Sequence, residues 1–298
     1  MKTGFISIVG RANVGKSTLL NAMIGEKVAI VSSKPQTTRS KIIGIYNDKD
    51  VQLVFVDTPG LHTPKNRLGQ HMVRQTQEAM EDVDAVLLVV EPRPAGGTEK
   101  QLLQRLQQMD VPVILVINKI DQVAKSRVAQ TIATYAELYD FTAVVPVSAL
   151  RQDGVQIVLD ELMPLASESP SAYYPDDIAT DQTVRQMAAE IVREKILRNM
   201  RDEVPHGVAV EVEKFAERTS SSGKPVTDIS VAIICERAAH KGMLIGKQGS
   251  MLKKMAEQAR GDLEQLVGTK VYLECFVKVK EDWRDSEKAI AELHLYDE

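Results

Sequence analysis

The strongest constraint on the fold is the segment Gly10-Arg11-Ala12-Asn13-Val14-Gly15-Lys16-Ser17, which matches the pattern G-x-x-x-x-G-K-[S/T]. An apolar run, Phe5–Val9, precedes it, and the helix-forming residues Thr18–Met23 follow it. Two glycines allow the backbone to turn tightly, and the loop N–H groups together with a helix N-terminus bind anions. The segment therefore predicts a phosphate-binding loop, in which Lys16 reaches the β- and γ-phosphates and the Ser17 hydroxyl binds Mg²⁺.

Composition limits the remaining possibilities. With 298 residues the chain is long enough for two domains, and a net charge of −4 means that any surface for nucleic acid or membrane must be local. Cys235 and Cys275 lie in apolar, strand-like runs, which favours buried thiols in a reducing compartment over a disulfide or a metal site. The N-terminal apolar stretch is too short for a signal peptide and no run has membrane-spanning length, so we expect a cytoplasmic protein.

The first 166 residues show a repeating order of strand and helix. Six strands are predicted, at Phe5–Val9, Ile42–Asn47, Gln52–Asp57, Ala85–Val90, Val113–Asn118 and Ala143–Ser148. The last three are nearly continuous apolar runs, as expected for strands covered on both faces. This pattern predicts an α/β domain over residues 1–166 with a mostly parallel, doubly wound sheet. Ligands of such sheets bind beyond the carboxyl ends of the strands.

Three further motifs follow predicted strands. In Asp57-Thr58-Pro59-Gly60, the carboxylate can hold Mg²⁺ through water and the Gly60 N–H can meet a γ-phosphate. In Asn118-Lys119-Ile120-Asp121, the Asp121 carboxylate suits the two N–H donors of guanine, which predicts GTP rather than ATP. Asn118 would tie the base loop to the phosphate loop, and the Lys119 stem would cover the base. Ser148-Ala149-Leu150 could offer a backbone N–H to the guanine oxygen. Each motif alone is common in turns.

The four motifs in this order resemble the small GTPases over about residues 1–165. The resemblance assigns Lys34–Arg39 to the first switch loop, with Thr38 as the preferred second hydroxyl on Mg²⁺ and Thr37 as the alternative. Leu61 stands where Ras-like proteins carry the glutamine that orients the attacking water, so no catalytic glutamine is assigned. Arg39 and Arg67 are interpreted as surface charges rather than arginine fingers.

Asn13 resembles the asparagine of potassium-activated GTPases, in which K⁺ lies between this side chain, phosphate oxygens and switch-loop carbonyls. The alternative is that Asn13 only caps the loop by hydrogen bonding, and both interpretations stay open. The predicted catalytic residues are Lys16, Thr38 and Gly60, and the predicted metal ligands are Ser17, Thr38 and Asp57. The predicted nucleotide-binding residues are Gly10, Arg11, Ala12, Asn13, Val14, Gly15, Lys16, Ser17, Thr18, Asp57, Thr58, Pro59, Gly60, Leu61, Asn118, Lys119, Asp121, Ser148, Ala149 and Leu150.

Residues 167–180 interrupt the alternation of strands and helices. Prolines and serines without periodicity predict a linker here. Residues 181–298 then show a second pattern: a helix at Val184–Leu197, alternating strands at Val208–Val212 and Ile229–Ile233, a helical region, and a last strand at Val271–Val279. This order predicts a separate α+β domain.

The helical region contains Gly246-Lys247-Gln248-Gly249, a G-x-x-G segment between two helices. Glycines there allow close approach of a nucleic-acid backbone, and the lysine adds charge. A lone G-x-x-G is usually a turn, but the surrounding order resembles a type II KH domain, which binds single-stranded RNA. Met243, Leu244 and Ile245 could line a base-binding groove; the alternative is that they anchor the helix in the core, and this alternative is favoured for Ile245 above the other two. The predicted RNA-binding residues are Met243, Leu244, Ile245, Gly246, Lys247, Gln248, Gly249 and Lys253.

A GTPase domain followed by a type II KH domain, together with Lys280–Arg284, resembles the Era family of bacterial GTPases over essentially the whole chain. The resemblance implies hydrolysis of GTP to GDP, Mg²⁺ as cofactor with K⁺ as a candidate activator, and binding to the 3′ end of small-subunit ribosomal RNA during 30S assembly and maturation. It also implies peripheral association with the inner face of the cell membrane, and we expect a monomer. Two alternatives stay open: a translation- or tRNA-related GTPase, and an RNA-binding module with weak nucleotide hydrolysis.

Overall fold

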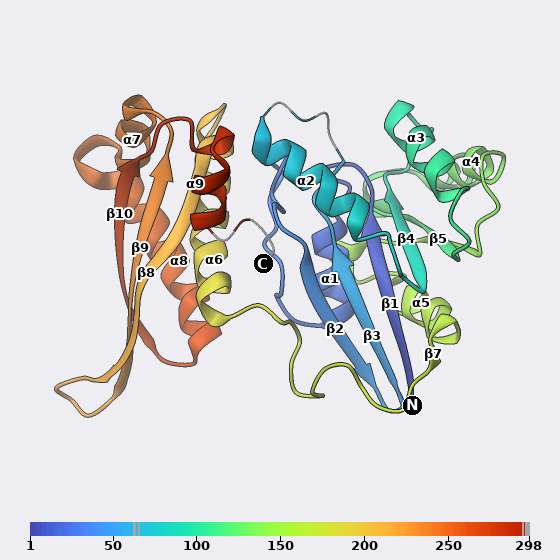
Figure 1. The fold of residues 1–298 in the computed structure, drawn as a ribbon, viewed down its shortest axis with the longest axis horizontal. Helices are drawn as coiled ribbons and strands as arrows, with labels where there is room; N and C mark the ends of the chain where they lie inside the picture. The colour runs from blue at the N-terminus through green and yellow to red at the C-terminus, as the bar shows by residue number, and fades with distance from the viewer. Residues whose placement is uncertain (62–63, 65, 294, 296–298) are drawn as a thin grey trace. The chain divides into compact units, whose positions relative to one another are not determined.

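The computed structural model of the chain describes residues 1–61, 64, 66–293 and 295, so the last residues of the predicted domain 181–298 lie outside the described residues. The chain folds into two compact units, and the main boundary between them lies after Asp181. Within the described residues the first unit is built on a seven-stranded sheet and the second on a three-stranded sheet (Figure 1). The predicted fold class is confirmed for both parts.

The first sheet has the order β2-β3-β1-β4-β5-β6, with β7 paired to the start of β1. Only β2 and β7 run antiparallel to their neighbours, so β3, β1, β4, β5 and β6 end at the same edge of the sheet. The predicted motifs follow these ends. The strands are β1 (Lys2–Val9), β2 (Ile42–Asp48), β3 (Val51–Asp57), β4 (Ala85–Val90), β5 (Val113–Ile117), β6 (Ala143–Pro146) and β7 (Ser167–Glu168).

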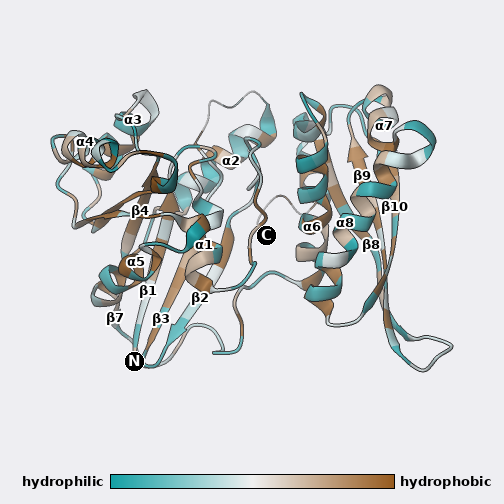
Figure 2. Ribbon diagram, turned by 180° about the vertical axis from the view of Figure 1, so that it is seen from behind, coloured by the Kyte–Doolittle hydropathy of each residue, from teal (hydrophilic) through white to brown (hydrophobic). Residues whose placement is uncertain are grey.

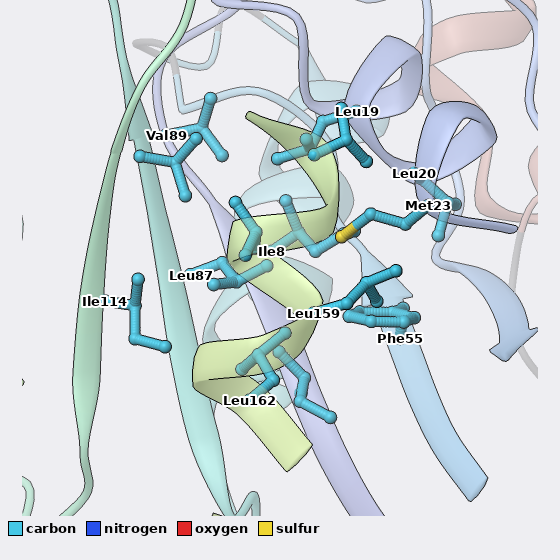
Figure 3. Packing of buried hydrophobic residues seen from close by; sticks show 14 of the residues in the cluster. Ile8, Leu19, Leu20, Met23, Phe55, Leu87, Val89, Ile114, Leu159 and Leu162 are labelled. Atoms are coloured by element: carbon cyan, nitrogen blue, oxygen red, sulfur yellow. The ribbon is translucent and has the colours of Figure 1, made fainter. Parts of the chain in front are cut away.

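Helices cover both faces of this sheet. Apolar residues of α1 and α5 pack on one face, where Leu19, Leu159 and Leu162 meet Ile8 and Leu87 (Figure 3). Residues of α3 and α4 pack on the other face. The interior is therefore mainly aliphatic, as the low aromatic content predicts. The helices are α1 (Lys16–Ile24), α2 (Arg67–Glu78), α3 (Gly97–Leu106), α4 (Lys125–Ala136) and α5 (Val155–Leu162).

The predicted linker begins with β7 and then lies against the first unit. The side chain of Gln52 on β3 is fully buried, and its Oε1 accepts hydrogen bonds from the backbone N–H groups of Tyr173 and Tyr174 at 2.9 and 3.0 Å. Its Nε2 donates to the Tyr174 carbonyl at 2.9 Å and to Asn47 Oδ1 at 2.8 Å. One buried amide thus uses all its hydrogen-bonding capacity to hold the linker.

Further along, the linker follows the edge strand β2. The Ile45 N–H donates to the Ala179 carbonyl at 2.8 Å, and the Thr180 hydroxyl donates to the Ile43 carbonyl at 2.6 Å. Tyr174 and Ile178 pack on a small apolar cluster formed by β2 and β3. Residues 167–181 accordingly belong to the first compact unit.

The second unit places three helices on one face of its sheet, whose order is β10-β9-β8. Strand β9, central and strongly apolar in Figure 2, runs antiparallel to β8 and parallel to β10. A parallel pair needs a crossover connection, which α7 and α8 supply. The elements are α6 (Val184–Asn199), β8 (Val208–Thr219), β9 (Pro225–Cys235), α7 (Ala238–Ile245), α8 (Ser250–Val267), β10 (Lys270–Val279) and α9 (Glu287–Glu292).

Both cysteines lie in this second sheet and are free thiols. Cys235 is buried and Cys275 is half-buried, and burial raises the pKa of the Cys275 thiol to about 12. Among the residues that the structure describes, no group of three or more His, Cys, Asp or Glu side chains is arranged to hold a metal. No helix in the described part of the chain has the length and apolarity to cross a membrane.

Candidate functional site

The phosphate loop between β1 and α1 has backbone geometry that requires its glycines. Gly10 and Gly15 have positive φ, and a Cβ on them would lie 2.3 Å from the Val89 carbonyl oxygen and from Asn118 Nδ2, respectively. Asn13 also adopts a left-handed conformation, with φ of 65°. The loop therefore depends on close packing against the ends of β4 and β5 as well as on its own sequence.

Lys16 lies at the first position of α1 and is almost completely buried, with 6% exposure. Its Nζ donates to the carbonyls of Gly10 and Arg11, each at 3.3 Å. Burial lowers the pKa of the Lys16 ammonium, and the nearby Asp57 carboxylate opposes this shift. The ammonium group is thus held inside the loop, where the β- and γ-phosphates of a nucleotide would bind.

Three oxygen-bearing side chains meet beside the loop. Ser17 Oγ donates to Asp57 Oδ2 at 2.6 Å and lies 2.9 Å from Thr38 Oγ1, which is 3.5 Å from the same carboxylate oxygen. Asp57 is fully buried, its pKa is raised by desolvation, and its Oδ1 has no hydrogen-bond partner among the described residues. Hard oxygen ligands with one unsatisfied carboxylate oxygen fit Mg²⁺, which usually combines one or two carboxylates with substrate phosphates.

The two threonines of the first switch loop differ in their contacts. Thr38 is buried beside Ser17, whereas the Thr37 hydroxyl donates to the Lys34 carbonyl at 2.7 Å and lies 2.7 Å from Ser32 Oγ. The geometry favours Thr38 over Thr37 as the metal ligand. Arg39, interpreted from sequence as a surface charge, is instead 2% exposed, so that interpretation is wrong.

The segment after β3 packs tightly on the phosphate loop. A Cβ on Gly60 would lie 2.5 Å from Ala12 Cα and 2.7 Å from Ala12 N. The Leu61 N–H donates to the Gly10 carbonyl at 3.1 Å, and the Thr58 hydroxyl donates to a carbonyl of β1 at 2.8 Å. Gly60 is therefore held against the phosphate loop, while the Leu61 side chain offers no polar group to a water.

Asn118 joins the two nucleotide-binding loops. Its Nδ2 donates to the Val14 carbonyl at 2.9 Å, and its Oδ1 accepts from the backbone N–H groups of Lys119 and Ala149 at 2.8 and 3.1 Å. The structure thus contains the expected contact from the base loop to the phosphate loop. Within the segment Ser148-Ala149-Leu150, which was expected to offer a backbone N–H to guanine, the Ala149 N–H is thus engaged by Asn118.

Asp121 has a positioning partner that the sequence analysis missed. Ser148 Oγ donates to Asp121 Oδ1 at 2.7 Å, which fixes the carboxylate that is expected to face guanine. The position of Ser148 in the sequence is the signal for this contact, because it follows β6 at the sheet edge where Asp121 follows β5. Leu150, by contrast, is 78% exposed.

The remaining predicted nucleotide-binding residues have mainly structural contacts. Val14 is buried in the core under the loop, and Thr18 is half-buried in the first turn of α1. The Pro59 carbonyl accepts a hydrogen bond from the Thr76 hydroxyl at 3.1 Å. The Arg11 guanidinium lies 3.4 Å from the buried Glu99 carboxylate of α3.

In the second unit, the G-x-x-G segment forms a tight connection between α7 and α8. Gly246 has φ of 72°, and a Cβ there would lie 2.7 Å from Met251 Cβ, so this position requires glycine. A Cβ on Gly249 would meet open space. Lys247, Gln248 and Lys253 are exposed and available to a ligand.

The apolar residues before this segment do not all behave as predicted. Leu244 is fully buried and cannot line an RNA groove, because it points into the core between the sheet and the helices. Ile245 packs against the same core, as its alternative interpretation held. Only Met243 is exposed, at 55%. Helical periodicity places adjacent residues on different faces, so three consecutive residues of α7 cannot all line one groove.

Comparison with known proteins gives matches to both units. Residues 5–119 match a family model described as a 50S ribosome-binding GTPase, and residues 203–284 match a KH domain model. The chain is 45% identical over 293 residues to GTPase Era of Ruminiclostridium cellulolyticum, covering 98% of this chain and 97% of the relative. It is 46% identical over 293 residues, with the same coverage, to GTPase Era of Caldanaerobacter subterraneus.

Solved structures match the whole chain as well. One is a crystal structure of Era in complex with MgGDPNP and nucleotides 1506–1542 of 16S ribosomal RNA, with a TM-score of 0.94, 34% identity and full coverage of both chains. Another is a point variant of Aquifex aeolicus Era bound to GDP·AlF₄⁻, with the same TM-score, identity and coverage. The similarity therefore extends across both units.

Proposed function

Because this chain belongs to the Era family of GTPases, we propose that it couples GTP hydrolysis to binding of the 3′ end of 16S ribosomal RNA and assists assembly and maturation of the 30S subunit. It hydrolyses GTP to GDP and phosphate, as family membership implies. The observation that carries the RNA proposal is the match of both units to a relative that was crystallised with a GTP analogue and a 16S segment.

One family model is described as a 50S ribosome-binding GTPase, but this description does not argue against the small subunit as the partner. That model covers residues 5–119 and therefore contains no part of the KH unit. The full-length relative carries a segment of 16S RNA, which belongs to the small subunit. Because the KH unit is the part expected to contact RNA, the full-length comparison is the better guide.

We assign Mg²⁺ to the oxygen cluster of Ser17, Thr38 and Asp57. When bound there it neutralises charge on the β- and γ-phosphate oxygens. Lys16 adds positive charge within the phosphate loop, and the Gly60 N–H donates to the γ-phosphate. These groups stabilise charge that develops during attack by water, which is the main source of catalysis in phosphoryl transfer.

Leu61 leaves the attacking water without the usual glutamine, so other groups must contribute positive charge and orientation. We propose K⁺ as that contributor, held partly by Asn13. The position of Asn13 supports this proposal. Asn13 lies inside the phosphate loop in a left-handed conformation, and its backbone carbonyl accepts a hydrogen bond from Lys119 Nζ at 2.5 Å. The capping interpretation of Asn13 remains the competing one.

Gel-shift titration with a 16S 3′-end RNA tests the proposal. The variant carries Lys247→Glu and Lys253→Glu, and the matched control carries Lys288→Glu on α9, where the side chain is 87% exposed. Phosphate contacts lose affinity when a lysine becomes an acid. We expect at least a tenfold loss for the double variant and less than a twofold change for the control. Equal binding by the double variant and wild type, with unchanged melting temperatures, would contradict RNA binding at this segment.

The same titration, run beside an assay of GTP turnover, separates the alternatives. A tRNA preferred over the 16S segment would favour the translation-related function, and RNA binding without measurable GTP turnover would favour the simple RNA-binding module. A monomeric state and peripheral membrane association stay predictions, which light scattering and vesicle flotation would test.

A further inference from the structure

Glu91 lies at a position from which it can act on both nucleotide-binding loops. It directly follows β4, whose last residue is Val90, and β4 lies between β1 and β5 in the sheet. The phosphate loop follows β1, and the Asn118–Asp121 segment follows β5. A side chain at the end of β4 therefore stands between the loop for the phosphates and the loop for the base.

Lys119 contacts both Glu91 and the phosphate loop. Its backbone is left-handed, with φ of 66°, and its Nζ donates to the Asn13 carbonyl at 2.5 Å and to Glu91 Oε1 at 2.6 Å. Both side chains of the ion pair are 28% exposed, so the pair is partly accessible to solvent. The other oxygen of Glu91, Oε2, lies 3.2 Å from Arg93 Nη2.

We propose that Glu91 is a positioning residue, which holds the Lys119 ammonium on the phosphate loop and thereby slows the release of guanine nucleotides. The inference rests on the proposed nucleotide site, in which the Lys119 stem covers the base. Lysine has four rotatable bonds, and ordering it on ligand binding costs conformational entropy. A carboxylate that fixes the ammonium group in advance lowers that cost.

This role predicts a particular pattern of effects. The base is the same in GTP and GDP, so a contact that only positions Lys119 stabilises both complexes and the transition state equally. Losing it should raise the dissociation rate and KM while leaving the single-turnover rate at saturating GTP near that of wild type. Because the pair is partly exposed, the effect should shrink as salt concentration rises.

The experiment measures the dissociation of fluorescent GDP and GTP analogues by stopped flow from the full-length protein. Glu91→Gln keeps the shape of the side chain and removes its charge. We expect dissociation to become about three- to tenfold faster for both analogues, in line with the loss of one charge-assisted hydrogen bond. Arg93→Gln is the matched control, since it removes the other cation beside Glu91 without touching Lys119, and should change the rate less than twofold.

A double-mutant cycle decides whether Glu91 acts through Lys119. Lys119→Met keeps the stem and removes the ammonium group, so adding Glu91→Gln to it should have no further effect on dissociation. An equal acceleration in both backgrounds would overturn the inference and leave the nucleotide site intact. If Lys119→Met alone released nucleotides at the wild-type rate, the ammonium group would not retain them and this inference would fail. If Lys119→Ala, which removes the stem as well, left nucleotide affinity unchanged, the assignment of Lys119 to the base site would fail.

Discussion

Replacing Gly60 by alanine tests whether the segment after β3 must stay packed on the phosphate loop during catalysis. The added Cβ would lie 2.5 Å from Ala12 Cα and 2.7 Å from Ala12 N, closer than the 3.0 Å that such contacts essentially never fall below. Both neighbours are backbone atoms that a side-chain rotation cannot move. The segment carrying Gly60 therefore has to shift away from the loop by several tenths of an ångström or more.

The size of the effect follows from this displacement. The Gly60 N–H is expected to contact only the γ-phosphate, so GDP affinity should change less than threefold. A misplacement of about 1 Å at a reacting group costs on the order of a hundredfold in rate. We therefore expect Gly60→Ala to reduce single-turnover hydrolysis about a hundredfold at saturating GTP.

Single-turnover assays with radiolabelled GTP, together with calorimetric titration of GDP, measure both quantities. Gly97→Ala is the matched control, because a Cβ on Gly97 at the start of α3 meets nothing within 4 Å and φ there is not positive. It should hydrolyse GTP at the wild-type rate. A Gly60→Ala variant with normal hydrolysis and normal folding would refute the idea that Gly60 stays against Ala12 in the reactive state.

Five other substitutions test the site and its surroundings. Asp121→Asn should weaken GTP binding by about a hundredfold or more and improve binding of xanthosine triphosphate, measured by competition calorimetry, because the amide loses two charge-assisted hydrogen bonds to guanine. Thr38→Ala should raise the Mg²⁺ concentration needed for half-maximal hydrolysis about tenfold, whereas Thr37→Ala should leave it near wild type. If K⁺ binds at Asn13, wild-type hydrolysis should be faster in potassium than in sodium at equal ionic strength, and Asn13→Ala should remove the difference; equal wild-type rates would reject the potassium site. Gln52→Met should accelerate amide hydrogen exchange in the docked linker by about ten- to a hundredfold, and unchanged exchange would show that this amide does not hold it.

The sequence predicted the candidate site best where all the interacting groups lie within one short segment of the chain. The phosphate loop and Asp57–Gly60 could be located because glycine spacing and strand ends determine where they lie. Thr38 could be preferred over Thr37 from its spacing to Ser17, and in the structure the two hydroxyl oxygens of Ser17 and Thr38 lie 2.9 Å apart. In such segments the residue types and their order in the chain are enough to predict which groups lie together.

It was least informative where partners are far apart in the chain. Gln52 is an ordinary polar residue in its own strand, and only contact with residues more than 120 positions away makes it a buried anchor. Ser148 and Asp121 are separated by 27 positions, and their pairing depends on the neighbouring ends of β5 and β6. Glu91 belongs to no recognised motif, and its position directly after β4 is the only sequence signal for its contact with Lys119.

The docked linker also decides where the GTPase unit can be separated from the rest of the chain. A cut after residue 166, where sequence pattern ends the domain, would remove Tyr174 and Ile178 from the apolar cluster of β2 and β3. It would also remove the hydrogen-bond partners of the Ile45 N–H and the Ile43 carbonyl on the edge strand β2. An uncovered edge strand beside an exposed apolar patch promotes aggregation. A soluble, excised GTPase fragment therefore has to extend through Thr180.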